Sequence, residues 1–363
     1  MRQVKGKGVI RLPKASNHLD YLGSRNQELM PLVSSKDLLI KAQQEGYAIG
    51  AFNANNMECV QAVIETAEAE RAPVILQVSQ GAIAYAGLEF ATMLVKTAAE
   101  LATVPVVLHL DHGTDFDQNV RCLRAGFTSL MYDGSDKPVE ENIEVSAKIA
   151  EIAHACGIPV ETELGKIPKI EDFHSMLPAS YDYSTKLPRE IQDKVEQLMA
   201  DPDQAEEFVA RTHCDSLAAA VGSIHSMMKD VQPLRIDRLV AVRERTGMPI
   251  VLHGASGVIK TRADADRMGI ELAENEGTVE DAIKAGISKI NVATEVSMAF
   301  LRGIERAHEK DPGQKDMRNI LLPGKKEVKE TVRDFMRLFG CSGKAGEPSG
   351  TSGLRESAIK HHE

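Results

Sequence analysis

Short apolar runs recur along the chain, and each is followed by a stretch with helical periodicity. The runs cover residues 47–53, 74–79, 104–113, 129–134, 158–165, 216–222, 248–254 and 287–294. Most are continuous rather than alternating, which is typical of parallel strands covered by helices. Between them lie amphipathic segments such as residues 57–72 and 139–157, and the second ends on a glycine that suits a helix C-cap.

The spacing of the runs predicts the fold. Their starts lie 27, 30, 25, 29, 58, 32 and 39 residues apart, and one strand–helix unit needs about 30 residues. Eight such units predict an α/β protein with a (β/α)8 TIM-barrel fold. The competing open, doubly wound sheet lacks support, because no GxGxxG motif follows the first run.

Two of the intervals are long and predict insertions near residues 173–202 and 261–280, after the fifth and seventh strands. Loops that follow barrel strands lie on the face that carries active sites, so we expect both insertions to shape or cover the site.

The two ends of the chain differ from its repeating middle. Residues 1–29 are basic and show no sustained periodicity, whereas residues 344–363 are rich in Gly and Ser and contain few apolar residues. We therefore expect an N-terminal extension over 1–29, one barrel over 30–343 and a flexible C-terminal tail over 344–363.

Composition narrows the class of protein. Of the 363 residues 43% are hydrophobic and 26% charged, which is ordinary for a globular enzyme and excludes a disordered chain. The net charge of −10 disfavours non-specific nucleic-acid binding. No apolar run approaches the roughly 20 residues that cross a bilayer. The five cysteines are scattered without a CxxC pair, which fits a reducing cytosol. We expect a cytoplasmic protein that binds neither nucleic acid nor membrane.

Polar residues collect at the carboxyl ends of the predicted strands. They are His109, Asp111 and His112 on the third, Glu161 and Glu163 on the fifth, His225 after the sixth, His253 on the seventh, and Asn291 and Thr294 on the eighth. Such groups are costly to bury without a partner, and convergence at one barrel mouth would supply a metal as that partner. Three imidazoles with one open position are a common catalytic Zn²⁺ arrangement, so His112, His225 and His253 predict a zinc site. We expect His109, which shares a strand face with Asp111, to support that site or to belong to the core.

Two segments have the features of an anion-binding turn. HGASG (253–257) places small residues directly after a strand, and NVATE (291–295) does the same after the last strand. Backbone N–H groups of such turns can face a phosphate, and phosphate sites after strands seven and eight recur in this fold. Together the two segments favour a phosphorylated substrate over two ordinary tight turns.

These residues resemble the class II, metal-dependent ketose-bisphosphate aldolases, and most closely their tagatose-bisphosphate and short fructose-bisphosphate branch. The resemblance runs from Met30 to Gly343 through FNANNME, HLDHGTDFD, VETELG, EDF, SLAAAVGSIH, VLHGASG, KINVATE and FGCSGK. It implies a lyase of carbohydrate metabolism, such as glycolysis, that cleaves fructose or tagatose 1,6-bisphosphate to dihydroxyacetone phosphate and an aldehyde phosphate. A homodimer or homotetramer is also implied.

The resemblance also assigns roles to individual residues. It implies that His112, His225 and His253 hold Zn²⁺, that Glu163 holds it in an alternative position, and that Asp111 is the acid/base for the C4 hydroxyl. Glu171 matches the acid that exchanges a proton with the three-carbon product. The residues that match the substrate and phosphate site are Asn53, Ser226, Gly254, Ser256, Asn291, Ala293 and Thr294. A monovalent cation, Na⁺ or K⁺, is implied near that site.

The chain departs from the family pattern at three places near the predicted site. Pro168-Lys169 replaces a Gly-Gly pair, Ser226 replaces a glycine after the second metal histidine, and the insertion over 173–202 is not usual for the short branch. These places concern the loop and the sugar, so the exact ketose stays open. Three alternatives remain: a paralogue acting on another phosphorylated ketose, a catalytically silent zinc-binding barrel, and a class I aldolase that uses Lys289.

Overall fold

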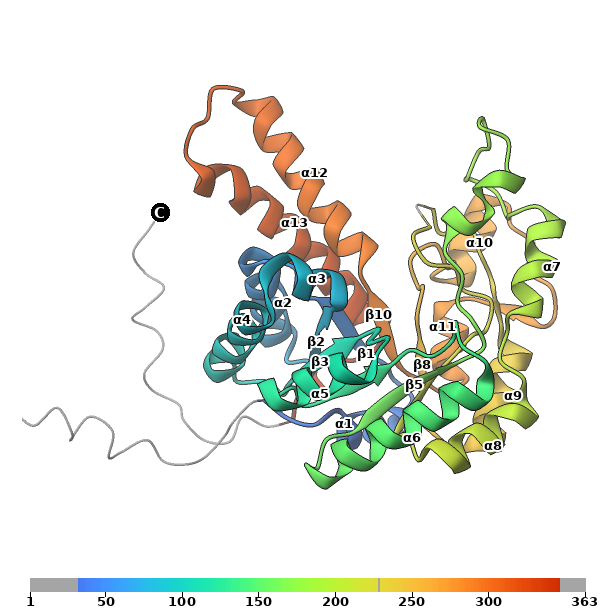
Figure 1. Ribbon diagram of the computed structural model, residues 1–363. Coiled ribbons are helices and arrows are strands. Elements are labelled where there is room, and N and C mark those ends of the chain that lie inside the picture. The colour runs from blue at the N-terminus through green and yellow to red at the C-terminus, as the bar shows by residue number, and fades with distance from the viewer. Residues whose placement is uncertain (1–31, 228, 347–363) are drawn as a thin grey trace, which may run out of the picture. The chain divides into compact units, whose positions relative to one another are not determined.

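Eight parallel strands form the centre of the molecule (Figure 1). The computed structural model describes residues 32–227 and 229–346. The strands are β1 (Ile49–Asn53), β2 (Val74–Ser79), β3 (Val106–Asp111), β4 (Leu130–Tyr132), β5 (Val160–Leu164), β6 (Ser216–Ala219), β8 (Ile250–Leu252) and β10 (Ile287–Val292). Each lies inside one of the apolar runs, so the eight predicted strands are confirmed. The predicted extension over 1–29 and all of the predicted tail except residues 344–346 lie outside the described residues.

The strands close into a barrel in the order β3-β2-β1-β10-β8-β6-β5-β4, and every pair among them is parallel. The two ends of that order meet, because His109 of β3 forms a parallel bridge with Ser129 just before β4. The predicted (β/α)8 barrel is therefore confirmed. Its strands are buried along nearly their whole length, which explains why their sequences are continuously apolar.

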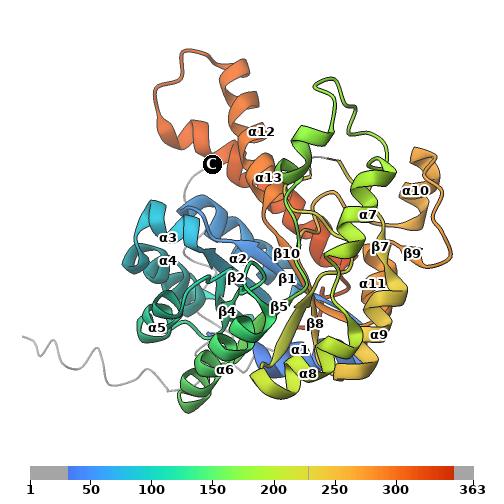
Figure 2. The same ribbon diagram turned by 45° about the vertical axis from the view of Figure 1, so that its right-hand side comes forward.

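Helices alternate with the strands and cover the outside of the barrel (Figure 2). They are α2 (Met57–Glu70), α3 (Gln80–Ala86), α4 (Leu88–Leu101), α5 (Phe116–Ala125), α6 (Val139–Ala155), α8 (Pro202–Thr212), α9 (Ile236–Thr246), α11 (Val279–Lys284) and α13 (Met317–Leu338). Several begin at side-chain caps that the sequence supplies. Asn56 accepts a hydrogen bond from the Cys59 N–H (2.8 Å) and Asp115 from the Gln118 N–H (2.7 Å), which fixes where α2 and α5 start.

Helix α1 (Ser35–Glu45) lies across the amino ends of the strands. Its Ser35 hydroxyl donates to Ser129 before β4, Lys36 pairs with Asp215 before β6, and Gln43 donates to the Met248 carbonyl before β8. The floor of the barrel is thus covered, and ligands have access from the carboxyl ends of the strands.

The two predicted insertions add structure on that carboxyl-end face. The first contains the 3-10 helix η1 (Ile170–Met176) and α7 (Arg189–Gln197), and the second contains α10 (Arg262–Met268). Two short strands that the apolar pattern did not predict, β7 (Leu234–Arg235) and β9 (Glu276–Gly277), pair antiparallel nearby. The first insertion has its own buried cluster, separate from the main core.

A helical hairpin of α12 (Thr294–Lys310) and α13 extends past the barrel (Figure 1). The two helices cross closely at Gly303 and Gly324, where a Cβ on Gly303 would overlap the backbone of Pro323 and Gly324. Only glycine permits so close an approach of two helix backbones at this point.

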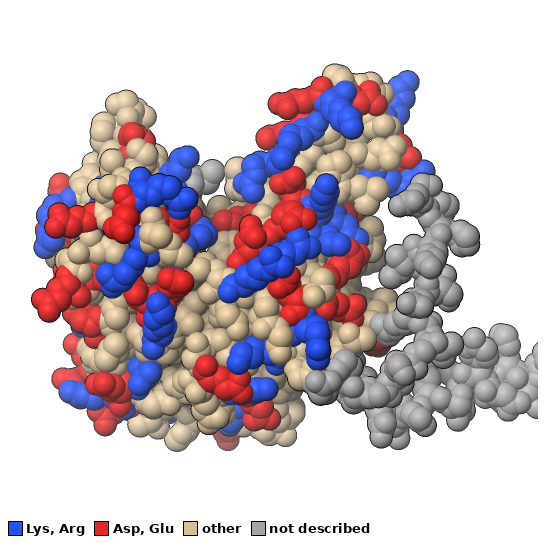
Figure 3. All heavy atoms as spheres, turned by 180° about the vertical axis from the view of Figure 1, so that it is seen from behind, with Lys and Arg blue, Asp and Glu red and all other residues tan. Residues whose placement is uncertain are grey.

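Lys and Arg side chains are interspersed with Asp and Glu across the face that Figure 3 shows. Such mixing is typical of a solvated surface rather than of a nucleic-acid interface, which needs clustered cations. Within residues 32–227 and 229–346, no helix is both long and apolar enough to cross a membrane.

Candidate active site

Three histidines from different strand ends meet at the mouth of the barrel. His112 follows β3, His253 follows β8, and His225 lies in the loop after β6. Each offers an imidazole nitrogen, and these nitrogens lie within 4.8 Å of one another. The ring centroids of His112 and His253 are 4.6 Å apart, and those of His112 and His225 are 5.2 Å apart. The predicted convergence of the three side chains is confirmed.

His112 is surrounded by carboxylates. Its Nδ1 lies 2.7 Å from Asp133 Oδ2 and 3.9 Å from Glu163 Oε2, and its Nε2 lies 3.9 Å from Asp111 Oδ1. Burial opposes the charged imidazole, but these carboxylates outweigh it and raise the pKa of His112 to about 10 in the metal-free chain. Asp133 was missed by the sequence analysis, although it directly follows β4 and so also stands at a strand end.

His253 is held from below by a buried hydrogen-bonded chain. Its Nε2 lies 2.8 Å from Glu161 Oε1, and the Lys289 ammonium donates to Glu161 Oε2 at 2.7 Å. Lys289 also lies 3.1 Å from His109 Nε2, whose Nδ1 is 2.8 Å from the Ser129 hydroxyl. Burial and Lys289 keep the pKa of His109 well below its usual range, so this imidazole is neutral. His109 therefore supports the site from within the barrel, which is one of the two roles expected for it.

Lys289 is about 1% exposed and fully engaged with Glu161 and His109. It lies below His253 rather than in the cavity that contains the three histidines, whose lining residues do not include it. A class I mechanism needs a lysine that can reach the substrate, so this arrangement disfavours that alternative.

Glu163 is the second acid beside the histidines. It is about 1% exposed, its Oε1 accepts a hydrogen bond from the Ile167 N–H at 3.3 Å, and its Oε2 has no partner in the described chain. Burial and the neighbouring Asp133 raise the pKa of Glu163 to about 8. Glu163, Asp133 and His112 form a second group whose ligand atoms lie within 4.8 Å of one another.

Asp111 ends β3 and lines the same cavity. It is 5% exposed, and its Oδ1 accepts a hydrogen bond from Asn291 Nδ2 at 3.0 Å. The same amide nitrogen lies 3.2 Å from His253 Nε2, and Asn291 Oδ1 is buried without a partner in the described chain. Asn291 thus fixes the carboxylate of Asp111 next to the histidines.

His225 is positioned through its backbone rather than by a strand. Its N–H donates to the Pro168 carbonyl (2.8 Å), and its own carbonyl accepts from the Ile170 N–H (3.1 Å). Ser226, the next residue, has a φ of 63°, the left-handed conformation that glycine adopts without strain. Glu171 follows Ile170 and is exposed on η1, outside the residues that line the cavity.

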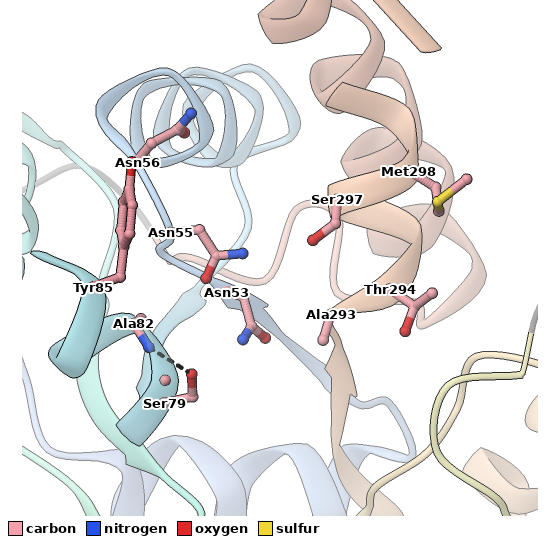
Figure 4. A pocket seen from close by; sticks show the side chains of 11 residues that line it. Asn53, Asn55, Asn56, Ser79, Ala82, Tyr85, Ala293, Thr294, Ser297 and Met298 are labelled. Atoms are coloured by element: carbon pink, nitrogen blue, oxygen red, sulfur yellow. Dashed lines mark hydrogen bonds between the residues drawn. The ribbon is translucent and has the colours of Figure 1, made fainter. Parts of the chain in front are cut away.

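Two cavities adjoin at this mouth. The smaller, about 120 Å³, is lined by Asp111, His112, His225, Asn291 and the predicted phosphate-site residues Ser226, Gly254, Ser256, Ala293 and Thr294. The larger, about 610 Å³, shares Ala293 and Thr294 with it and opens beside β1, β2 and α12 (Figure 4). Asn53 lines the larger cavity and accepts a hydrogen bond from Gln77 at 2.6 Å.

The smaller cavity has the features of an anion site. Helix α12 starts beside it, and its N-cap Ala293 provides no side-chain acceptor for the first-turn N–H groups, which leaves that helix end suited to a phosphate. Gly254 has a φ of 62°, and a Cβ there would lie 3.1 Å from the Ile224 carbonyl carbon. The Ser256 hydroxyl donates to Glu295.

A (β/α)8 barrel with a cluster of three histidines flanked by carboxylates at the carboxyl ends of its strands has the architecture of a metal-dependent barrel enzyme. Comparison with known proteins defines the family. The profile described as fructose-bisphosphate aldolase class-II matches residues 33–344. The chain belongs to the class II fructose-bisphosphate aldolase family, and the family resemblance predicted from the sequence is confirmed.

Relatives that match most of the chain agree with this assignment. A fructose-bisphosphate aldolase of Geobacillus stearothermophilus is 39% identical over 323 residues, which cover 88% of this chain and 100% of the relative. A D-tagatose-1,6-bisphosphate aldolase subunit of Klebsiella oxytoca is 34% identical over 314 residues, 86% of this chain and 99% of the relative. The crystal structure of the YdjI aldolase from Escherichia coli K12 matches with a TM-score of 0.67 at 32% identity, covering 87% of this chain and 100% of that one. As a member of an aldolase family, the chain is a lyase.

Proposed function

We propose that this enzyme cleaves a ketose 1,6-bisphosphate, fructose or tagatose, reversibly to dihydroxyacetone phosphate and an aldehyde phosphate, with Zn²⁺ as its cofactor. The observation that carries this proposal is the meeting of His112, His225 and His253 beside Asp111 in one cavity. Membership of the aldolase family supports the same reaction. Two relatives also support it, one named for fructose bisphosphate and the other for tagatose 1,6-bisphosphate.

The three histidines fit a zinc ion. Burial lowers the pKa values of His225 and His253, so both are neutral imidazoles, the form that binds a metal. His112, whose pKa is about 10, would release its proton when a metal binds. His112 Nε2 and His253 Nδ1 lie only 2.9 Å apart, and both nitrogens are directed into the same small space. Zinc held there supplies a Lewis acid that stabilises negative charge on the former ketose carbonyl oxygen.

The chain's own carboxylates move the protons. Asp111, held by Asn291, takes the proton of the C4 hydroxyl as the bond between C3 and C4 breaks. Glu171 returns a proton to the three-carbon product. The main-chain hydrogen bonds that join Pro168 and Ile170 to His225 hold the start of η1 next to the site, and Glu171 reaches the product when this segment closes.

Glu163 provides a second position for the metal. It forms a ligand group with Asp133 and His112, so His112 belongs to both groups. Glu163 would hold a metal on the Nδ1 side of His112, whereas His112 faces His253 through Nε2. The Oε2 atom of Glu163 lies 3.9 Å from His112 Nδ1 and has no hydrogen-bond partner among the described residues.

Backbone N–H groups recognise the substrate phosphate in this proposal. Gly254, Ser256, Ala293 and Thr294 surround the small cavity, with Ser226 on its other side, and a monovalent cation, Na⁺ or K⁺, binds nearby. The rest of the sugar extends past Asn53 into the larger cavity (Figure 4). We further propose that the enzyme is cytoplasmic and acts as a homodimer or homotetramer.

Cleavage of fructose and tagatose 1,6-bisphosphates, coupled to NADH-dependent reduction of dihydroxyacetone phosphate, tests the proposal. Activity should disappear with a strong chelator and return with Zn²⁺. Activity that survives complete metal removal would refute the mechanism. Turnover of another ketose phosphate, but of neither hexose bisphosphate, would favour the paralogue, whereas bound zinc without any turnover would favour a silent barrel.

A further inference from the structure

The first insertion packs against the loop that carries His225. Phe173, Leu177, Leu187, Ile191 and Val195 of segment 173–202 belong to one buried cluster that also contains Ile224, Met227 and Val231. Ile224 and Met227 flank His225 and Ser226 in sequence, and both are about 1–2% exposed. We refer to this cluster as the satellite core.

The other side of the His225 loop is held by the segment that follows His253. Gln232 N–H donates to the Gly257 carbonyl (2.9 Å), and Ile259 N–H donates to the Gln232 carbonyl (3.0 Å). A Cβ on Gly257 would overlap Met227, so the two segments are in close backbone contact. The His225 loop therefore lies between the segment that follows His253 and the satellite core.

The two insertions are also fastened to each other. Lys186 of the first insertion donates to the Glu276 carboxylate and to the Glu271 carbonyl of the second, both at 2.7 Å. Ile270 of the second insertion packs against the satellite core. The insertions thus form one unit that covers the His225 loop from the side opposite His253.

A loop histidine needs such support. His112 and His253 directly follow strands that the whole barrel holds, whereas His225 lies six residues beyond the end of β6. The apolar contacts of Ile224 and Met227 restrict this loop on either side of His225, while His225 itself is joined to Pro168 and Ile170 through its backbone.

We propose that segment 173–202 positions His225 for metal binding, and that Ile191 is the central positioning residue. Ile191 is fully buried in α7, within the satellite core and outside the cavities at the barrel mouth. It touches neither metal nor substrate and acts through Ile224 and Met227. This inference rests on the proposed metal site and adds a determinant of zinc affinity to it.

Zinc affinity is the readout that separates positioning from general stability. Ile191→Ala should raise the zinc dissociation constant about tenfold, the range found when groups that orient metal ligands are removed. The constant is measured by competition with a chromophoric chelator, and the visible spectrum of the Co²⁺-substituted protein reports the ligand geometry. The spectrum should change in this variant.

The matched control is Ile149→Ala, an identical truncation at a buried position of α6 in the main core. It should lower the melting temperature comparably and leave zinc affinity and the Co²⁺ spectrum unchanged. An unchanged zinc dissociation constant in Ile191→Ala would overturn the proposal, and so would equal weakening in both variants.

A surface variant covers the case in which Ile191→Ala does not fold. Lys186→Met breaks the contact between the insertions without opening the satellite core, and should weaken zinc binding about threefold. An unchanged affinity in that case would overturn the proposal. Wild-type protein that binds zinc but cleaves no ketose bisphosphate would refute the proposed function alone, whereas wild-type protein that takes up no zinc would refute both.

Discussion

Replacing Lys289 by methionine tests the buried chain beneath His253. Lys289 and Glu161 are about 1% and 2% exposed, and their charged atoms are 2.7 Å apart. Methionine fills nearly the same volume but carries no charge. In the variant, Glu161 keeps its contact with His253 (2.8 Å) but loses its ion pair with Lys289, its one partner of fixed positive charge among the described residues.

The cost follows from that distance. Two unit charges 2.7 Å apart attract by about 6 kcal/mol at an effective dielectric constant of about 20. Part of this lost attraction is offset, because the variant no longer bears the free-energy cost of desolvating the ammonium group. Breaking a buried pair on one side typically costs about 3–5 kcal/mol, and we expect Lys289→Met to lower the free energy of unfolding by that amount at pH 7.

Guanidinium unfolding of the metal-free protein measures this loss without a contribution from bound zinc. The double variant Lys289→Met/Glu161→Gln serves as the control, because it also removes the stranded charge and should recover part of the stability. A loss below about 1 kcal/mol in the single variant, or no recovery in the double variant, would refute the ion-pair reasoning.

Three further predictions concern other parts of the molecule. Asp111→Ala should keep zinc and lose cleavage, while His225→Ala should lose both; equal zinc loss in a metal-content assay would show that Asp111 is a ligand instead. Ser226→Gly relieves the left-handed strain at a φ of 63° and should raise the free energy of unfolding by about 1 kcal/mol in a denaturant titration. Lys36 and the Val160 N–H, against the effect of burial, hold the pKa of Asp215 below its usual range. Asp215→Asn should therefore destabilise by about 1–3 kcal/mol at pH 7. The difference should shrink as the pH falls below about 4, where the unfolded chain takes up its proton, and vanish only below the depressed pKa of the folded carboxylate; a difference that persists in stronger acid would exclude this origin.

The sequence pattern was sufficient for the barrel because its strands are covered on both faces. Continuous apolar runs placed all eight strands, although the run at 129–134 yields only three strand residues and the run at 216–222 only four. The strands β7 and β9 have two residues each, which is too short for any periodicity to reveal. Their pairing depends on contacts about 40 residues apart in the chain.

The site was predictable where side chains follow strands and unpredictable where contacts are made across the barrel. His112 and His253 could be placed from strand ends, and the same signal was available for Asp133 but was not used. The chain from Ser35 through Ser129, His109, Lys289 and Glu161 to His253 joins six separate segments, and no local pattern marks which buried polar groups will meet. The satellite core could not be predicted for the same reason, since the sequence showed the length of the insertion and not its partners.

The charges around the histidines favour a cation at the mouth of this barrel. Four carboxylates and one ammonium group lie at or just below the histidine cluster. The carboxylates are those of Asp111, Asp133, Glu161 and Glu163, and the ammonium group is that of Lys289. Each phosphate of a bisphosphate substrate adds a charge of about −1.5 to −2, and the chain as a whole has a net charge of −10. The larger cavity is lined by amide, hydroxyl and apolar groups, which offset none of this repulsion. In the metal-free chain the His112 imidazolium, whose pKa is raised to about 10, and the raised pKa of Glu163, about 8, offset part of this charge at neutral pH. The proposed divalent cation on the three histidines would offset two charges when bound. Phosphate recognition in this acidic molecule is therefore expected to be local, through the proposed metal and the backbone N–H groups at the start of α12, rather than through its overall field.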